Sequence, residues 1–221
     1  RVSMTVGLVA SALILLIGSI YGAVAGYFGG KVDMVMMRIV DILYTIPDIL
    51  VIILLAQVLE YPLMSLGKTP GFGWIRSLGP NMVSMFIVFA LLYWVGMARI
   101  VRGQIMVLKQ NEYVTAARAM GASNKQIITR HLITNCIGTL IVTTTLQIPS
   151  SIFTESFLSF LGLGVQAPTP SLGSLASNAL NGLQTFPEKL FAPAFMIFVI
   201  ILSFNLLGDG LRDAFDPKMK R

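Results

Sequence analysis

Five long apolar runs constrain the fold of this chain more than any other feature of its sequence. They cover residues 5–28, 34–59, 82–101, 132–160 and 191–208. A helix needs about 20 mostly apolar residues to cross the hydrocarbon core of a bilayer. Of the 221 residues, 55% are hydrophobic and only 12% are charged, which is far from the balance of a soluble domain. The sequence therefore predicts an all-α integral membrane protein with five spans, organised as one transmembrane domain over residues 1–221.

The run 132–160 is longer than one crossing requires. At 1.5 Å per residue it would extend about 43 Å, whereas the bilayer core is about 30 Å thick. Pro149 lies inside this run, and proline removes a helical hydrogen bond. We therefore expect a kink at Pro149 and a separate short helix over 152–161. Glu155 would lie in that short helix, either facing a cavity or partner, or solvated at the membrane boundary.

Lysine and arginine are unevenly distributed among the segments between the runs. The central segment holds Arg99, Arg102, Lys109, Arg118, Lys125 and Arg130, and the end of the chain holds Arg212, Lys218, Lys220 and Arg221. Residues 161–190, in contrast, contain only Lys189. Because cytoplasmic loops are enriched in these two residues, we expect the central loop and the C-terminus to face the cytoplasm. The net charge of +6 then implies no nucleic-acid partner.

The second run carries more polar residues than a lipid-facing helix tolerates. Arg38, Asp41 and Asp48 recur at helical spacing and fall near one face. Charged side chains inside a span usually face protein or a water-filled cavity. These residues, together with Glu155, are therefore candidates for a translocation path or a subunit interface. The alternative is that Arg38 and Asp41 lie close to the cytoplasmic boundary and simply pair with each other.

The first run contains glycines at intervals of four residues. Gly18, Gly22 and Gly26 repeat on one helical face, and Gly30 continues the series. Small residues let two helix backbones approach closely in lipid, where van der Waals contact drives helix association. We therefore expect this face to pack against another helix.

The central loop, residues 109–131, has the pattern of two short helices rather than of a simple connector. Asn111 is a good N-cap residue, and Glu112 would lie favourably in the first turn of the first helix. Gly121 suits the left-handed end of that helix. Ser123 and Gln126 have the spacing of a capping box, which predicts a second helix leading into the run from 132.

The first of these two helices is amphipathic. Its apolar positions at helical spacing are Tyr113, Ala116, Ala117 and Met120. Such a helix, small in its middle and rigidly joined to a span, is suited to receive a soluble partner.

The sequence contains no pattern of a catalytic or metal-binding site. His131 is the only histidine and Cys136 the only cysteine, so neither a metal cluster nor an intramolecular disulfide is supported. Residues 66–69, Leu-Gly-Lys-Thr, resemble the end of a phosphate-binding loop, but Pro62 replaces the upstream glycine and no strand precedes it. We therefore predict no catalytic residues, no metal and no nucleotide site in this chain.

Several stretches resemble one family of transporters. Residues 112–123 read Glu-Tyr-Val-Thr-Ala-Ala-Arg-Ala-Met-Gly-Ala-Ser, 155–164 read Glu-Ser-Phe-Leu-Ser-Phe-Leu-Gly-Leu-Gly, and 205–217 end in Phe-Asp-Pro. They resemble the binding-protein-dependent, MetI-like permeases of ATP-binding-cassette (ABC) importers, in particular the C-type subunit of the dipeptide and oligopeptide branch. The resemblance implies a type I importer transmembrane domain in a prokaryotic cytoplasmic (inner) membrane, importing peptides by alternating access. Nickel or another small solute is an alternative cargo, and a secondary carrier is an alternative class.

The resemblance also implies partners and a coupling site. The partners would be a sister permease forming a heterodimer, two ABC ATPase subunits that hold ATP and Mg²⁺, an extracytoplasmic substrate-binding protein and membrane lipid. The residues expected to contact an ATPase are Glu112, Tyr113, Ala116, Ala117, Met120, Gly121 and Ala122. The chain starts at Arg1 without a methionine, as a cut or processed chain would, and the resemblance implies a six-span parent with one further N-terminal span.

Overall fold

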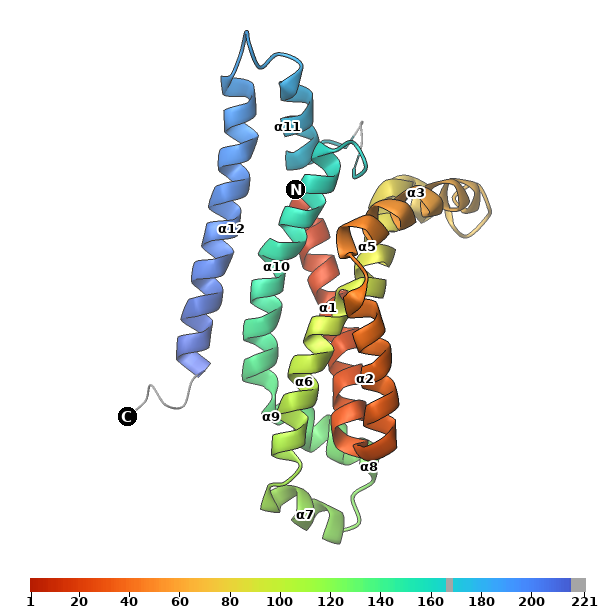
Figure 1. Ribbon diagram of the computed structural model, residues 1–221, viewed down its shortest axis with the longest axis vertical. Coiled ribbons are helices and arrows are strands. Elements are labelled where there is room, and N and C mark those ends of the chain that lie inside the picture. Colours follow the sequence, from red (N-terminus) through yellow and green to blue (C-terminus); the bar gives the residue numbers. More distant parts are fainter. Residues whose placement is uncertain (166–168, 216–221) are drawn as a thin grey trace.

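The computed structural model describes residues 1–165 and 169–215 (Figure 1). All regular secondary structure within these residues is helical. Five helices, or continuous pairs of helices, are long and apolar enough to cross a membrane: Val2–Phe28, Asp48–Leu66, Pro80–Leu108, Ile137–Phe160 and Glu188–Phe215. The predicted all-α class and the number of spans are confirmed. The basic residues Lys218, Lys220 and Arg221 lie outside the described residues.

Helix α1 (Val2–Phe28) is the centre of the bundle. It packs against α6 (Trp94–Leu108), α10 (Ile137–Phe160) and α5 (Pro80–Leu92). One apolar cluster joins α1 to α6 and to the segment around residues 127–140, and a second joins α1 to α5 and α3. Every other long helix is therefore positioned directly or indirectly by α1.

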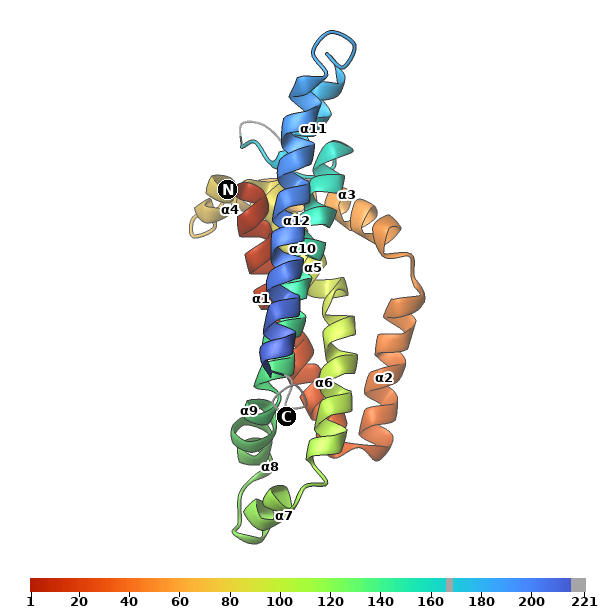
Figure 2. The ribbon, with the colours of Figure 1, turned by 90° about the vertical axis from the view of Figure 1, so that its left-hand side faces the viewer.

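We predicted that the second apolar run forms one helix, but it forms two. Helix α2 (Gly30–Thr45) ends at Ile46, and α3 (Asp48–Leu66) begins after Pro47 and leaves at an angle (Figures 1 and 2). Proline disfavours the α conformation of the residue before it, and Ile46 is accordingly extended. Helix α3 continues through Pro62 to Leu66, and α4 (Gly73–Leu78) follows it.

The third run forms α5 and α6, which are interrupted only at Tyr93. The fourth run is interrupted at its start rather than at its proline. Helix α10 continues through Pro149 to Phe160, whereas a π-helical segment (Ile127–Leu132), the short α9 (Ile133–Asn135) and a break at Cys136 precede it. The prediction of a separate short helix after Pro149 is therefore wrong. Helix bundles in membranes tolerate such prolines because neighbouring groups compensate for the lost hydrogen bond.

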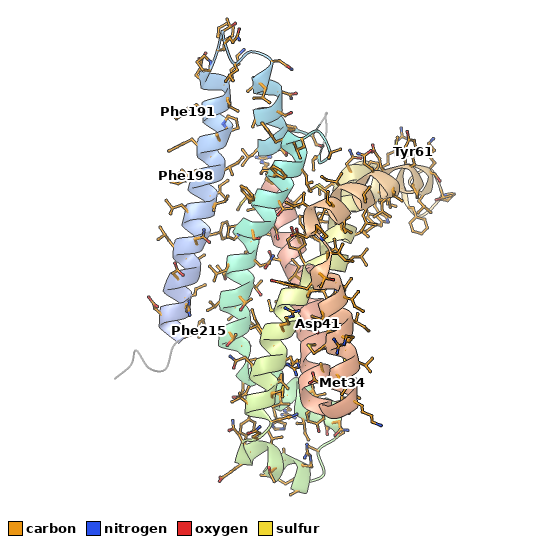
Figure 3. The ribbon with its side chains drawn as sticks, viewed as in Figure 1. Met34, Asp41, Tyr61, Phe191, Phe198 and Phe215 are labelled. Carbon is orange, nitrogen blue, oxygen red and sulfur yellow. The ribbon has the colours of Figure 1, made fainter. Side chains whose placement is uncertain are left out.

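The last two helices cover one side of α10. Helix α11 (Leu172–Leu180) starts at a capping box of Ser171 and Ser174, and α12 (Glu188–Phe215) packs on both α10 and α11. Most of α12 is exposed, and Figure 3 shows Phe191 and Phe198 on its outer side. An apolar face of this kind, on a helix long enough to cross a membrane, is suited to contact with lipid.

Candidate functional site

The central loop forms a projection at one end of the bundle. Helix α7 (Glu112–Ala119) lies below the ends of the long helices, and α8 (Asn124–Gln126) leads back toward them (Figures 1 and 2). Asn111 occupies the N-cap position of α7, but its side chain makes no capping hydrogen bond. Glu112 lies in the first turn, where a carboxylate interacts favourably with the helix dipole.

Gly121 ends α7 in the conformation that we predicted. Its φ is +84°, the Ala122 N–H donates to Ala117 O at 3.0 Å, and the Gly121 N–H donates to Arg118 O at 3.0 Å. This pair of bonds is the Schellman motif, which reverses the chain after a helix. The predicted capping box is also confirmed, because Ser123 Oγ accepts from the Gln126 N–H at 3.3 Å and Gln126 Oε1 accepts from the Ser123 N–H at 2.9 Å.

The orientation of α7 corrects one predicted contact. Val114 and Ala117 are buried against the rest of this chain, with only 1% and 2% of their surface exposed. Tyr113, Ala116 and Met120 are exposed and form the free apolar face. Ala117 is therefore not available to a partner, because it packs between α7 and the rest of this chain. Val114 was missed as a supporting residue, since it does not lie on the apolar stripe through Tyr113 and Met120.

Tyr27, near the end of α1, fastens this projection to the bundle. Its hydroxyl donates to Asn124 Oδ1 at 2.7 Å and accepts from Arg118 Nη2 at 3.3 Å. Lys109 adds a second link, because its Nζ donates to Gly26 O at 2.7 Å. Asn124 is exposed, yet its Oδ1 accepts this hydrogen bond from Tyr27. No pattern of sequence spacing links Tyr27 to residues almost a hundred positions away.

The glycine face of α1 lies directly against α6. A Cβ at Gly18 would lie 2.6 Å from Met97 Cβ, one at Gly22 would lie 2.4 Å from Ala98 O, and one at Gly26 would lie 2.8 Å from Arg102 O. These distances are too short for any side chain, so the two backbones touch over about two helical turns, from Gly18 to Gly26. Gly30 does not share this contact, because it is the first residue of α2, with a φ of +53° and open space around it.

Two ion pairs hold α2 beside α6. Asp33 accepts hydrogen bonds from the guanidinium of Arg102, and Asp41 Oδ1 lies 2.8 Å from Arg99 Nη2. The Arg99 guanidinium also lies over the Tyr44 ring, 4.3 Å from its centre. The predicted alternative that Arg38 pairs with Asp41 is therefore wrong.

Arg38 itself is exposed, and within the described part of the chain it has no acidic partner. Its position on the outer side of α2 leaves it available to a neighbouring subunit.

Replacing Asp33 with Asn should lower the free energy of unfolding of the purified protein at pH 7 by about 1–2 kcal/mol. This value lies between the typical contribution of an exposed ion pair and that of a hydrogen bond to a buried charged group. The hydrogen bond from Arg102 and its positive charge hold the pKa of the Asp33 carboxyl below its usual value. A carboxyl with a depressed pKa contributes stability above its unfolded pKa of about 3.9 and loses it as the pH falls further. The difference in thermal midpoint between the two proteins should therefore shrink below about pH 4. A difference that stays constant down to pH 3 would contradict this assignment.

A cavity of about 520 Å³ lies where the helix interruptions meet. It is lined by the α2–α3 bend, the α5–α6 junction and the middle of α10 next to Pro149. The polar residues in its wall are Tyr44, Thr45, Asp48, Tyr93, Gln147 and Ser150. Tyr93 is further held by its hydroxyl, which lies 3.3 Å from Thr154 Oγ1. Of the four predicted path residues, only Asp48 lies in this wall. Asp41 is connected to the wall indirectly, because its partner Arg99 lies over the ring of Tyr44.

Glu155 has a different environment from the other predicted path residues. It is fully buried, and its carboxylate accepts from Ser159 Oγ at 2.8 Å and from Ser156 Oγ at 3.3 Å. Ser159 Oγ also accepts from the Val165 N–H at 3.0 Å, so the carboxylate helps to anchor the segment after α10. The predicted alternative of a solvated carboxylate is wrong. Within the described residues Glu155 also lies away from the cavity wall.

This combination defines a class of protein. Five membrane-length helices, a cavity at their interruptions and a protruding amphipathic helix at one end are the parts of a transporter transmembrane domain. The fold agrees with a solved structure, an inward-facing conformation of the MetNI methionine ABC transporter, with a TM-score of 0.63 over 96% of this chain and 92% of the other at 16% identity. The fold is thus that of a type I ABC importer transmembrane domain.

A family model described as "Binding-protein-dependent transport system inner membrane component" matches residues 11–221. The chain belongs to this family, and the resemblance drawn from residues 112–123 is confirmed.

Similar curated proteins carry names of the same kind. The oligopeptide transport system permease protein OppC of Bacillus subtilis is 42% identical over the whole chain and 66% of the relative's length. The dipeptide transport system permease protein DppC of the same organism is 44% identical, again over the whole chain and 63% of its length. A glutathione transport system permease protein, GsiD of Pectobacterium atrosepticum, is 36% identical. The chain spans a little under two thirds of the length of both Bacillus relatives.

Proposed function

We propose that this chain is the translocating subunit of an ABC importer for peptides in a prokaryotic cytoplasmic membrane. The observation that carries the proposal is the similarity of 42–44% over the entire chain to an oligopeptide and a dipeptide permease. The exposed face of α7 and the cavity at the helix interruptions supply the two parts that such a subunit needs. The subunit itself performs no chemical reaction.

The family supports the proposed partners, and each is assigned here to an exposed surface of the molecule. Two ABC ATPase subunits, which bind ATP and Mg²⁺, would drive the cycle, one of them docking on Tyr113, Ala116 and Met120. Glu112, Gly121 and Ala122 lie next to this face and complete the coupling loop, 109–131. A sister permease would cover Arg38 and the open side of the cavity, and a substrate-binding protein would deliver peptide at the opposite end, near α4 and α11.

The mechanism that this geometry supports is alternating access. ATPase subunits that approach each other would move α7, and the movement would reach the long helices through α6 and through the contacts of Tyr27. The cavity would then open toward one side of the membrane at a time. Charge pairs such as Asp41–Arg99, next to the cavity, are of the kind that exchange partners in such transitions.

Purification of the full-length protein from native membranes tests the proposal. Two ATPases, a sister permease and a peptide-binding protein should accompany it, and the reconstituted complex should import peptides only with ATP. A complex that imports Ni²⁺ but no peptide would favour the metal-importing alternative. Uptake driven by an ion gradient without ATP would favour a secondary carrier.

The proposed orientation makes a separate prediction. Exposed Lys125 in α8 should face the cytoplasm, and exposed Gln184, beyond α11, should face outward. In a Cys136→Ser background, Lys125→Cys should react with a membrane-impermeant maleimide only after the cells are opened. Gln184→Cys should react in intact cells. The reverse pattern of labelling would overturn this orientation.

A further inference from the structure

Among the residues that the structure describes, Asp48 is the only charged one in the wall of the cavity at the helix interruptions. Every other polar side chain there belongs to a tyrosine, a threonine, a glutamine or a serine. The wall therefore carries a single negative charge. A cavity of about 520 Å³ has room for one end of a peptide rather than for a whole oligopeptide.

The Asp48 carboxylate is only partly satisfied by its own chain. Its Oδ1 accepts from the Ile49 N–H at 2.8 Å, which is a local bond at the start of α3. Throughout residues 1–165 and 169–215, Asp48 forms no ion pair, and Arg99, on the neighbouring α6, is already paired with Asp41. The second carboxylate oxygen is thus free to accept a hydrogen bond from a cationic group in the cavity.

The rest of the wall also favours a cation with several N–H groups. Pro47 has no N–H, so the carbonyl of Leu43, a residue of the wall, lacks its usual helical donor. Tyr44, another residue of the wall, has a hydroxyl that can accept a hydrogen bond from a cation, whereas its ring already lies under the Arg99 guanidinium. With one carboxylate and no histidine or cysteine, the wall lacks the ligand set of a transition-metal site.

We propose that Asp48 binds the protonated amino terminus of a peptide while the peptide occupies this cavity. The proposal rests on the proposed function above, because it assigns a peptide to the cavity. A primary ammonium offers three N–H donors, and the wall residues supply three kinds of acceptor: the free oxygen of Asp48, the carbonyl of Leu43 and the hydroxyl of Tyr44. The cavity would therefore select a free amino group, independently of any selection by a binding protein.

The test uses the complete complex in proteoliposomes without binding protein. Val51, one turn from Asp48 in the cavity wall, is replaced by cysteine in the Cys136→Ser background, and its alkylation rate is measured. Trialanine should slow the reaction roughly fivefold or more, whereas N-acetyl-trialanine should have little effect. Asp48→Asn should abolish the protection by trialanine. Asp209→Asn, a matched loss of charge at an exposed position of α12 outside the wall, should retain it.

A second measurement leaves Asp48 in place. Propylamine, which is a cation at pH 7, should protect position 51, whereas propionamide, similar in size and neutral, should not. Equal protection by the acetylated and the free peptide, or full protection in Asp48→Asn, would overturn the assignment. ATP-driven peptide uptake, measured on the same proteoliposomes after the binding protein has been added, separates the two proposals. Uptake without amino-terminal selectivity contradicts only the role of Asp48, whereas absence of uptake contradicts the importer function itself.

Discussion

Replacing Gly22 with alanine is expected to weaken the contact between α1 and α6 more than any other single methyl group added to the glycine face. The new Cβ would lie 2.4 Å from the carbonyl oxygen of Ala98 and 3.0 Å from the backbone nitrogen of Arg102. Backbone atoms cannot rotate away as a side chain can, so the two helices must separate. Overpacking of this kind costs about 1–3 kcal/mol, which corresponds to a fall in the thermal midpoint of roughly 2–12 °C for a chain of this size.

The same substitution at Gly103 provides the control. Gly103 lies on α6, but a Cβ there would meet nothing within 4 Å. Alanine also favours a helix over glycine by about 1 kcal/mol. Gly103→Ala should therefore leave the thermal midpoint in detergent unchanged or slightly higher. If Gly22→Ala and Gly103→Ala have the same midpoint, the close contact of the two backbones does not stabilise the bundle.

Replacing Ala116 with arginine is expected to release the ATPase while the permease stays folded in the membrane. Ala116 lies between Tyr113 and Met120 on the exposed face of α7, so a long cation would stand where a partner surface must approach. Truncating or blocking a central interface position typically costs about 2 kcal/mol or more, which is roughly a thirtyfold loss of affinity. The measurement is the amount of ATPase recovered with the tagged permease, together with substrate-stimulated ATP hydrolysis.

Three matched variants separate this effect from simple damage to the loop. Gln110→Arg adds the same charge at an exposed position in the turn before α7 and should retain the ATPase. Ala117→Arg places the charge on the buried side, so it should reduce the stability of the permease as well as the binding. Gly121→Val should act similarly, since a side chain in the left-handed region costs about 1–2 kcal/mol. Normal ATPase recovery with Ala116→Arg would show that this face of α7 is not the docking surface.

The sequence predicted the features that depend on local chemistry. Hydrophobic length determined the number of spans, and Gly121, Ser123 and Gln126 determined the turns of the central loop, because cap and turn preferences act over a few residues. The glycine spacing correctly indicated a packed face on α1. It did not identify α6 as the partner, since choice of partner depends on the whole bundle.

The incorrect predictions concern features that only tertiary contacts decide. Ala116 and Ala117 are chemically identical neighbours, and only the packing of Val114 against the bundle decides which of them is exposed. Pro149 and Pro47 are both prolines within apolar runs, yet only Pro47 ends a helix. The Asp33–Arg102 pair joins residues 69 positions apart, beyond the reach of any periodicity argument.

The π-helical segment before α10 makes the two ends of the central loop mechanically unequal. On one side, α7 follows α6 after a short turn, and α6 packs closely against α1 along the glycine face. A force on α7 is therefore transmitted to two helices that move as a rigid pair. On the other side, the force must cross the wider turns of residues 127–132 and the break at Cys136 before it reaches α10. We expect α1 and α6 to tilt together as one rigid unit, and α10 to follow less closely because the segment before it is more flexible. The end of α6 that is farther from α7 is the junction at Tyr93, in the wall of the cavity. A displacement of α7 would therefore change the width of the cavity beside Asp48.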